Sequence, residues 1–165
     1  MLQRLDARAI ALLIFAVAAA TLAGAWALQG MGYAPCELCL KQRYAYYLAL
    51  PLALAAWFSA GVNGRGARFL FALIALAFVA NAVLSAYHSG VEFKWWPGPA
   101  DCTGAYAGAG NVADFMKQLE QIKVVRCDEV SLRIFGFSLA NANIFISAAM
   151  AVLASMGAGR VMRRG

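Results

Sequence analysis

Four cysteines are the residues of this chain best suited to covalent chemistry. Cys36 and Cys39 form a C-x-x-C pair, whereas Cys102 and Cys127 lie 25 positions apart. The pair follows Pro35, which suits a helix start, so we expect both cysteines one turn apart at a helix N-terminus. Exposed amides and the helix dipole stabilise a thiolate there, so this placement favours redox activity.

A basic residue distinguishes the two cysteines of the pair. Arg43 follows Cys39 by four positions, a spacing that puts both side chains on one helical face. We therefore expect Cys39 to be the stable thiolate, buried nearer the membrane, and Cys36 to be its exposed partner. As an alternative, a basic residue at the boundary of an apolar run can simply extend to the lipid headgroups.

Two structural roles compete with redox activity at this pair. A disulfide between Cys36 and Cys39 would close so short a loop that it would add little stability. A zinc site would need a second closely spaced pair, whereas the other cysteines are far apart and the chain has one histidine. We expect no metal site.

Long apolar runs must position these residues. Of the 165 residues, 63% are hydrophobic and 13% are charged, which excludes the soluble enzyme classes. Four runs without charge or histidine, at 9–28, 44–62, 69–87 and 134–156, match the ~20 residues that a helix needs to cross a bilayer. We predict an all-α membrane protein, a four-transmembrane-helix bundle with one membrane domain over 1–165. The first run exceeds the roughly 7–15 apolar residues of a signal peptide, so we expect it to be retained.

The placement of the basic residues predicts the orientation. Segments 1–8, 63–68 and 157–165 hold seven arginines and one acid, whereas the outer loops 29–43 and 88–133 hold seven basic and seven acidic residues over a longer length. By the positive-inside rule both termini are cytoplasmic. All four cysteines then lie outside, in the periplasm of a bacterium, where disulfides persist. Charges dispersed in this way indicate topology, and we expect no nucleic-acid partner.

The second outer loop is long enough to have a function of its own. Trp95 and Trp96 are expected to anchor it at the membrane interface. Residues 111–125 have apolar positions at helical spacing, which predicts a short amphipathic helix that either lies on the membrane surface or packs on the outer ends of the spans. Either arrangement would hold Cys127 near the bilayer and leave Cys102 accessible.

Several of these motifs together resemble the disulfide bond formation protein B (DsbB) family. They are the segment CELCLKQRY at 36–44, His88 with Glu92, Pro97-Gly98-Pro99 before Cys102, and Ile134-Phe135-Gly136-Phe137-Ser138 after Cys127. The resemblance covers nearly the whole chain in order. It implies a four-helix bundle in the bacterial inner membrane that reoxidises a periplasmic, thioredoxin-like DsbA-like thiol oxidase and passes the electrons to a quinone, either ubiquinone or menaquinone.

The same resemblance implies a role for each site residue. Cys102 would receive the attack of the partner thiolate, Cys127 would be its disulfide partner, and the electrons would then move to Cys36 and Cys39. Cys39 would face the quinone. Arg43 would polarise the quinone, and His88 would lie near its ring. The chain departs from the family pattern at Ala142-Asn143, where members often have Trp-Asn, and at Leu132, in a region where aromatic residues are common.

Two other functions remain open at this point. One is a reductase of quinone-like or epoxide substrates on a similar bundle, although its C-x-x-C usually lies elsewhere along the chain. The other is a non-catalytic tetraspan scaffold whose outer loops contain structural disulfides. A pump or ion pathway is disfavoured because the four apolar runs contain no ionisable Asp, Glu, Lys, Arg or His.

Overall fold

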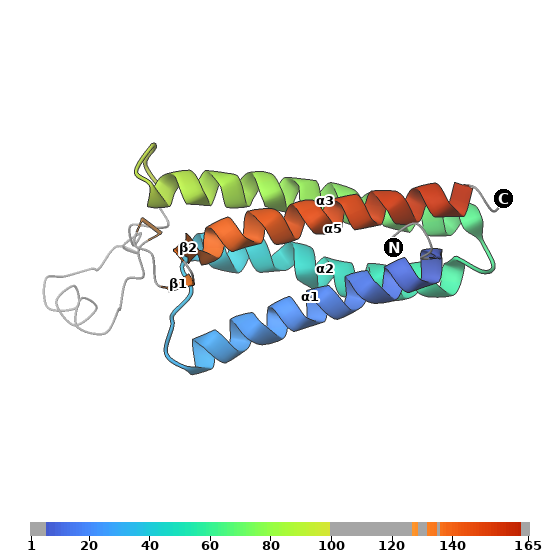
Figure 1. The fold of residues 1–165 in the computed structure, drawn as a ribbon, viewed down its shortest axis with the longest axis horizontal. Coiled ribbons are helices and arrows are strands. Elements are labelled where there is room, and N and C mark those ends of the chain that lie inside the picture. Colours follow the sequence, from blue (N-terminus) through green and yellow to red (C-terminus); the bar gives the residue numbers. More distant parts are fainter. Residues whose placement is uncertain (1–5, 100–126, 129–131, 135, 163–165) are drawn as a thin grey trace, which may run out of the picture.

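The computed structural model describes residues 6–99, 127–128, 132–134 and 136–162. Four helices run lengthwise beside one another: α1 (Ala7–Gly30), α2 (Glu37–Ser59), α3 (Gly64–Glu92) and α5 (Leu139–Met162) (Figure 1). Strands β1 (Arg133–Ile134) and β2 (Phe137–Ser138) form a short antiparallel hairpin just before α5. The all-α prediction is confirmed for this part of the chain. The helix predicted at 111–125 and Cys102 lie outside the described residues.

Polar caps set where the apolar runs become helices. Asp6 Oδ1 accepts the Ala9 N–H at 2.8 Å at the start of α1, and Asn63 Oδ1 accepts the Gly66 N–H at 3.0 Å at the start of α3. The first turn of a helix has amide groups with no partner inside the helix, and such side chains satisfy them. At α2 the capping residue is Cys36, so a reactive side chain occupies a structural position.

Three of the four predicted spans are confirmed by length and composition. Helices over Ala7–Gly30, Gly64–Glu92 and Leu139–Val161 are long and apolar enough to cross a membrane. Helix α2 is long enough to cross a membrane, but it is not among the described helices that are also apolar enough. Its sequence includes several tyrosines and a proline, Pro51, which lower its mean hydropathy. The span at 44–62 therefore stays a prediction.

The predicted boundary of the last span was wrong. We expected a helix from residue 134, but the β1–β2 hairpin occupies 133–138 and α5 begins at Leu139. Gly136 has φ of +85°, the left-handed conformation that favours glycine and turns the chain between the two strands. Ser138 Oγ then accepts the Asn141 N–H at 3.1 Å. The segment 134–138 is as apolar as the helix that follows, so composition alone did not reveal the turn.

Helices α2 and α3 extend beyond the apolar runs into the outer segments, and the helix start expected after Pro35 is confirmed. Helix α2 begins at Glu37, inside the loop predicted at 29–43, and α3 continues to Glu92, inside the loop predicted at 88–133. His88 is therefore a helical residue.

The helices approach closely because small residues line their contacts. Ala49, Ala53 and Ala56 of α2 are buried in one core cluster with the large side chains Phe71 and Phe78 of α3. Small residues at helix contacts let backbones approach in a membrane, where packing replaces the hydrophobic driving force.

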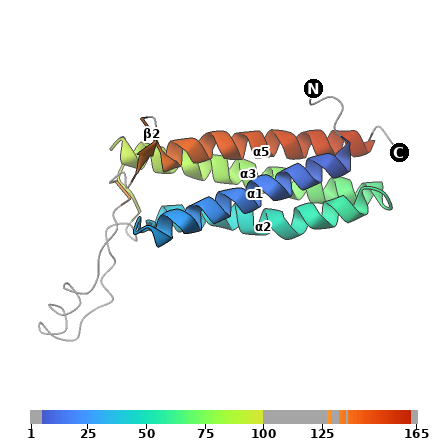
Figure 2. The same cartoon turned by 60° about the horizontal axis from the view of Figure 1, so that its bottom comes forward.

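Helix α1 crosses the bundle obliquely. Its first residues lie beside the end of α5, and its last residues lie away from α5, towards the start of α2 (Figures 1 and 2). The start of α1 and the end of α5 share one end of the bundle, and the start of α2 with its cysteines is at the other. This agrees with the predicted placement of both termini on one side, although which side that is stays a prediction.

Gly157 on α5 tests the close packing of α3 against α5. A Cβ atom at this position would lie 2.6 Å from Cε1 of Phe71, whose side chain is fully buried. We expect Gly157→Ala to lower the free energy of unfolding by about 1–3 kcal/mol, the usual cost of an overpacked core. Thermal unfolding in detergent measures this. Gly159→Ala is the matched control, because a Cβ there meets nothing within 4 Å. Equal stability of the two variants would contradict the packing.

Candidate active site

Cys36 and Cys39 lie at the N-terminus of α2, as the spacing predicts. Both are free, and their Sγ atoms lie 2.8 Å apart, compared with about 2.05 Å in a disulfide. The Cys39 N–H also donates to Cys36 Sγ at 3.3 Å, so Cys36 caps the helix through its sulfur. Two sulfurs at this distance can form a disulfide with little movement of the backbone.

The roles expected for the two cysteines are reversed in the structure. Cys36 is buried, whereas Cys39 is partly exposed. A hydrogen bond with the Cys39 thiol lowers the pKa of Cys36 to about 4, and His88 contributes in the same direction, although burial opposes both. The pKa of Cys39 is raised, first by its hydrogen bond with Cys36 and then by burial. The lowered pKa of Cys36 and the raised pKa of Cys39 favour a thiolate at Cys36 and a thiol at Cys39.

His88 lies beside the thiolate. It occupies the last turns of α3, and its side chain is only 2% exposed. His88 Nε2 is 3.5 Å from Cys36 Sγ and 3.9 Å from Oε1 of Glu92. The prediction placed His88 near a quinone ring. The structure places it against Cys36, and its side chain also lines the pocket described below.

Two further polar residues that the sequence analysis did not select hold His88 in place. Gln42 Nε2 lies 3.0 Å from His88 Nδ1, and Asn143 Nδ2 donates to Gln42 Oε1 at 2.9 Å. Asn143 entered the sequence analysis only as a departure from the family pattern. A usable signal was present: Asn81 and Ser85, and again Asn143 and Ser147, are polar pairs four residues apart within apolar helices. Such pairs lie on one helical face.

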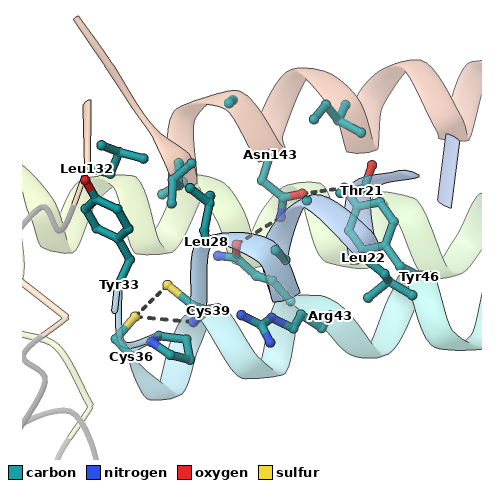
Figure 3. Close-up of a pocket in the computed structure, with 18 of the residues that line it drawn as sticks. Thr21, Leu22, Leu28, Tyr33, Cys36, Cys39, Arg43, Tyr46, Leu132 and Asn143 are labelled. Atoms are coloured by element: carbon teal, nitrogen blue, oxygen red, sulfur yellow. Dashed lines mark hydrogen bonds between the residues drawn. The ribbon is translucent and has the colours of Figure 1, made fainter. Parts of the chain in front are cut away.

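A pocket of about 310 Å³ opens beside the cysteine pair. This volume lies at the lower end of the ~300–1,000 Å³ typical of small-molecule sites. Its walls are mainly apolar and come from the last part of α1, the start of α2, the end of α3 and the start of α5. Figure 3 shows Cys39 and Arg43 on α2, with Asn143 across the pocket on α5. Arg43 Nη1 donates to Gln29 Oε1 at 3.0 Å, so its described partner is on α1 and not Cys39.

Cys127 approaches the site from the second loop. It is 2% exposed and packs in a small buried cluster with Cys36, Leu38 and Val91. Cys127 is disulfide-bonded, in contrast to the free pair. The prediction that Cys127 is held near the bilayer stays a prediction.

Aromatic residues cover the same end of the bundle. Trp96 lies over Gly90 so closely that a Cβ at that glycine would meet the indole ring at 2.0 Å. The Trp96 indole N–H donates to the Tyr87 carbonyl at 3.0 Å, and its ring stacks on the Tyr87 ring. Trp95 is 72% exposed. The membrane-anchoring role of both tryptophans stays a prediction.

The arrangement offers donors for two kinds of ligand. Cys36, Cys39 and His88 place three metal-binding atoms within 4.8 Å of one another. The pocket offers apolar walls with a few polar groups, among them Arg43, Gln42 and His88, which suits a flat, mostly apolar molecule with polar oxygens. The hydrogen bonds of His88 bear on the choice between a metal and an apolar molecule.

The fold and the cysteine geometry define a helical membrane protein equipped for thiol–disulfide exchange. The sequence matches the family described as "Disulfide bond formation protein DsbB" over residues 7–157, and the chain belongs to this family. It is also 25% identical over 117 residues to an uncharacterized protein of Rickettsia prowazekii (strain Madrid E). That alignment covers 70% of this chain and 66% of the relative, just under two thirds of its length. No solved structure matches the chain.

Family membership carries a general activity. The family is described by its role in disulfide bond formation, and three described helices of this chain are long and apolar enough to cross a membrane. The free cysteine pair at a helix N-terminus is a chemically suitable centre for that activity.

The reversed cysteine roles can be tested by the pH dependence of alkylation. Because the pKa of Cys36 is lowered to about 4, its thiolate should persist at pH 7 and be lost only as the pH falls through 4. The alkylation rate of Cys36, followed by mass spectrometry of its peptide, should therefore have its midpoint near pH 4. In Cys39→Ala the main cause of the shift is removed, and the midpoint should rise towards the ordinary thiol value of about 8.5.

Lys41→Ala is the control for this experiment. Lys41 is on the same helix and its side chain pairs with Glu37 at 3.7 Å. We expect its removal to leave the midpoint in place. A wild-type midpoint near pH 8.5, or a lower midpoint for Cys39 than for Cys36, would show that the assignment is wrong.

Proposed function

We propose that this protein is a quinone-dependent thiol oxidase that reoxidises a DsbA-like, thioredoxin-like disulfide oxidase in the periplasm. The observation that carries the proposal is the cysteine pair at the mouth of the pocket. Cys36, Cys39 and Arg43 all line the pocket, and the two sulfurs are 2.8 Å apart. A small apolar site that contains a thiol, a cation and few other polar groups suits a quinone head group.

Electrons would enter through the second loop. The partner thiolate attacks the sulfur of Cys102 in a disulfide with Cys127, and a mixed disulfide forms while Cys127 leaves as a thiolate. The second partner thiol then attacks the mixed disulfide, which releases an oxidised partner and a reduced pair of Cys102 and Cys127. The burial of Cys127 beside Cys36 supports the next exchange.

In that exchange the Cys127 thiolate attacks Cys36 in a disulfide with Cys39, and the Cys102 thiol then displaces Cys36. The outer disulfide is restored, and the inner pair keeps two electrons. A disulfide-bonded Cys127 beside a free inner pair is the combination that this scheme requires before the last step.

The inner pair gives up its electrons at the pocket. A quinone held by Arg43 and the apolar wall would supply the acceptor for two electrons and two protons. Cys36 and Cys39 lose two electrons as their S–S bond forms; Cys39 releases the proton it holds, and the second proton comes from solvent. Arg43 would orient the polar edge of the ring from the side of α2. Ubiquinone and menaquinone share the features that this pocket can recognise.

The proposed topology follows the chemistry. The cysteines would face the periplasm at one end of the bundle and both termini the cytoplasm at the other, with α2 as the fourth span. The position of the cysteines at the end opposite the start of α1 and the end of α5 supports this arrangement (Figure 1).

Purified protein, a reduced thioredoxin-like partner and a soluble quinone analogue test the function directly. We expect quinone reduction that depends on the partner. Cys102→Ser should abolish oxidation of the partner but leave the inner pair oxidisable by quinone, whereas Arg43→Ala should weaken quinone use and leave mixed-disulfide formation intact. If quinone is not reduced and both cysteine pairs are inert to the partner, the chain is a structural tetraspan protein. If electrons flow only from partner to another acceptor, a reductase is supported.

Gly24 tests the pocket itself. It lines the pocket on α1, and a Cβ at this position meets nothing within 4 Å. We expect Gly24→Leu to fill part of the site and raise the KM for quinone about tenfold, which corresponds to ~1.4 kcal/mol of binding free energy. Gly30→Leu is the control, since this α1 glycine is equally open but does not line the pocket. An unchanged KM in Gly24→Leu would remove the quinone from this pocket.

A further inference from the structure

A continuous chain of polar side chains links α5 to the Cys36 thiolate through the bundle. Asn143 on α5 is hydrogen-bonded to Gln42 on α2. Gln42 is hydrogen-bonded to His88 on α3, and His88 is hydrogen-bonded to Cys36. The three distances are 2.9, 3.0 and 3.5 Å. Gln42 and His88 are 6% and 2% exposed, so water does not readily replace these partners. The orientation of each amide group therefore matters.

The direction of every hydrogen bond in this chain is fixed by one backbone carbonyl. Ser85 Oγ donates its only proton to the carbonyl of Asn81 at 2.7 Å. Ser85 can therefore only accept from Asn143, at 2.8 Å, and the atom of Asn143 that faces it must be the amide nitrogen. Tyr46 donates to the other side of the same group, the oxygen Oδ1.

The same reasoning continues to His88. Asn143 Nδ2 also reaches Gln42, so the Gln42 atom that it meets is the oxygen Oε1. The Gln42 nitrogen must then face His88, and because that nitrogen only donates, His88 Nδ1 accepts. A neutral imidazole with an accepting Nδ1 carries its proton on Nε2. Cys36 Sγ, 3.5 Å from Nε2, is the acceptor for that proton, and the Glu92 carboxylate lies further off, at 3.9 Å.

We propose that Gln42 and Asn143 are positioning residues that hold His88 as the Nε2–H tautomer, so that His88 donates to the Cys36 thiolate. The inference rests on the proposed function in treating Cys36 as a redox cysteine. The opposite tautomer would turn a ring lone pair towards an anionic sulfur 3.5 Å away, which would disfavour the thiolate.

The tautomer also bears on the metal question. A histidine that binds a metal through Nε2 must carry its proton on Nδ1, where a carboxylate, carbonyl or water usually accepts it. Here Nδ1 faces the donor nitrogen of Gln42. The polar chain therefore keeps Nε2 protonated and closes the Cys36, Cys39 and His88 cluster to a soft metal, although its donor atoms are close enough to bind one.

The sequence provides a direct probe, because His88 is the one histidine of the chain. Nitrogen NMR of detergent-solubilised, ¹⁵N-histidine-labelled full chain without a histidine tag reports His88 alone, and nitrogen chemical shifts distinguish the two tautomers. We expect the wild-type protein to have Nε2 protonated and Nδ1 unprotonated. A wild-type spectrum with the proton on Nδ1 would overturn the proposal.

Two variants test the residues that set the tautomer. Gln42→Glu replaces the donor facing His88 with an acceptor of the same shape, so the proton should move to Nδ1. Asn143→Ala removes the group that orients Gln42 and adds no charge, so the Nε2–H population should fall although residue 143 does not touch His88. Asn141→Ala is the control. Asn141 is also on α5 and accepts a hydrogen bond from Ser89, but it is not one of the hydrogen-bonded side chains that link Asn143 to Cys36. An unchanged tautomer in both Gln42→Glu and Asn143→Ala would overturn the proposal.

A second readout measures the consequence at sulfur. In Asn143→Ala the equilibrium between thiolate and thiol at Cys36 should shift towards the thiol by about tenfold, in keeping with the loss of a hydrogen bond to a charged group. Alkylation against pH measures this, and an unshifted midpoint would contradict the proposed link to Cys36. Neither readout uses quinone or the partner. If the tautomer responds as expected but quinone is not reduced, the polar chain stands and the proposed function fails.

Discussion

A negative charge on Cys36 at the end of an apolar bundle is the constraint around which the site is arranged. A buried thiolate is unfavourable unless donors replace its water. The start of α2 supplies the Cys39 amide and thiol, and α3 supplies His88. One sulfur thus serves both as helix cap and as candidate nucleophile. A thiolate stabilised in this way is less basic, which also makes it a better leaving group when a disulfide at this position is attacked.

The polar groups inside the bundle follow from the same constraint. Among the described residues, no buried side-chain nitrogen or oxygen lacks a hydrogen-bond partner. In an apolar surrounding each such group is costly if left unpaired, so a network either closes completely or destabilises the fold. The hydrogen-bonded network ends at the Asn81 backbone carbonyl on one side and at Cys36 Sγ on the other. The structural requirement to satisfy Asn143 and Gln42 therefore also determines how His88 presents itself to Cys36.

Much of this could be predicted from the sequence, for identifiable reasons. Apolar runs located the four helices, and Pro35 followed by C-x-x-C placed the pair at a helix start. Helical spacing also put Arg43 on the side of Cys39, and both line the pocket. Spacing along one helix could not show which cysteine lies against α3, so the assignment of the thiolate failed. Gln42 and Asn143 were missed because their partners lie 46 and 101 positions away, contacts that only the packed bundle creates.

Uneven packing explains how one small bundle combines a rigid network with an accessible pocket. Near the end where α5 finishes, Gly157 lets the ring of Phe71 press against the helix backbone, which holds α3 and α5 together. At the cysteine end α1 departs from α5 (Figure 2). The pocket at this end is lined by residues of all four helices. Cys36, Cys39 and His88 of the cysteine site line the same pocket from the side of α2 and α3. A molecule bound in this pocket therefore lies directly beside the cysteine pair, while the close packing of Phe71 against Gly157 holds α3 and α5 together towards the other end of the bundle.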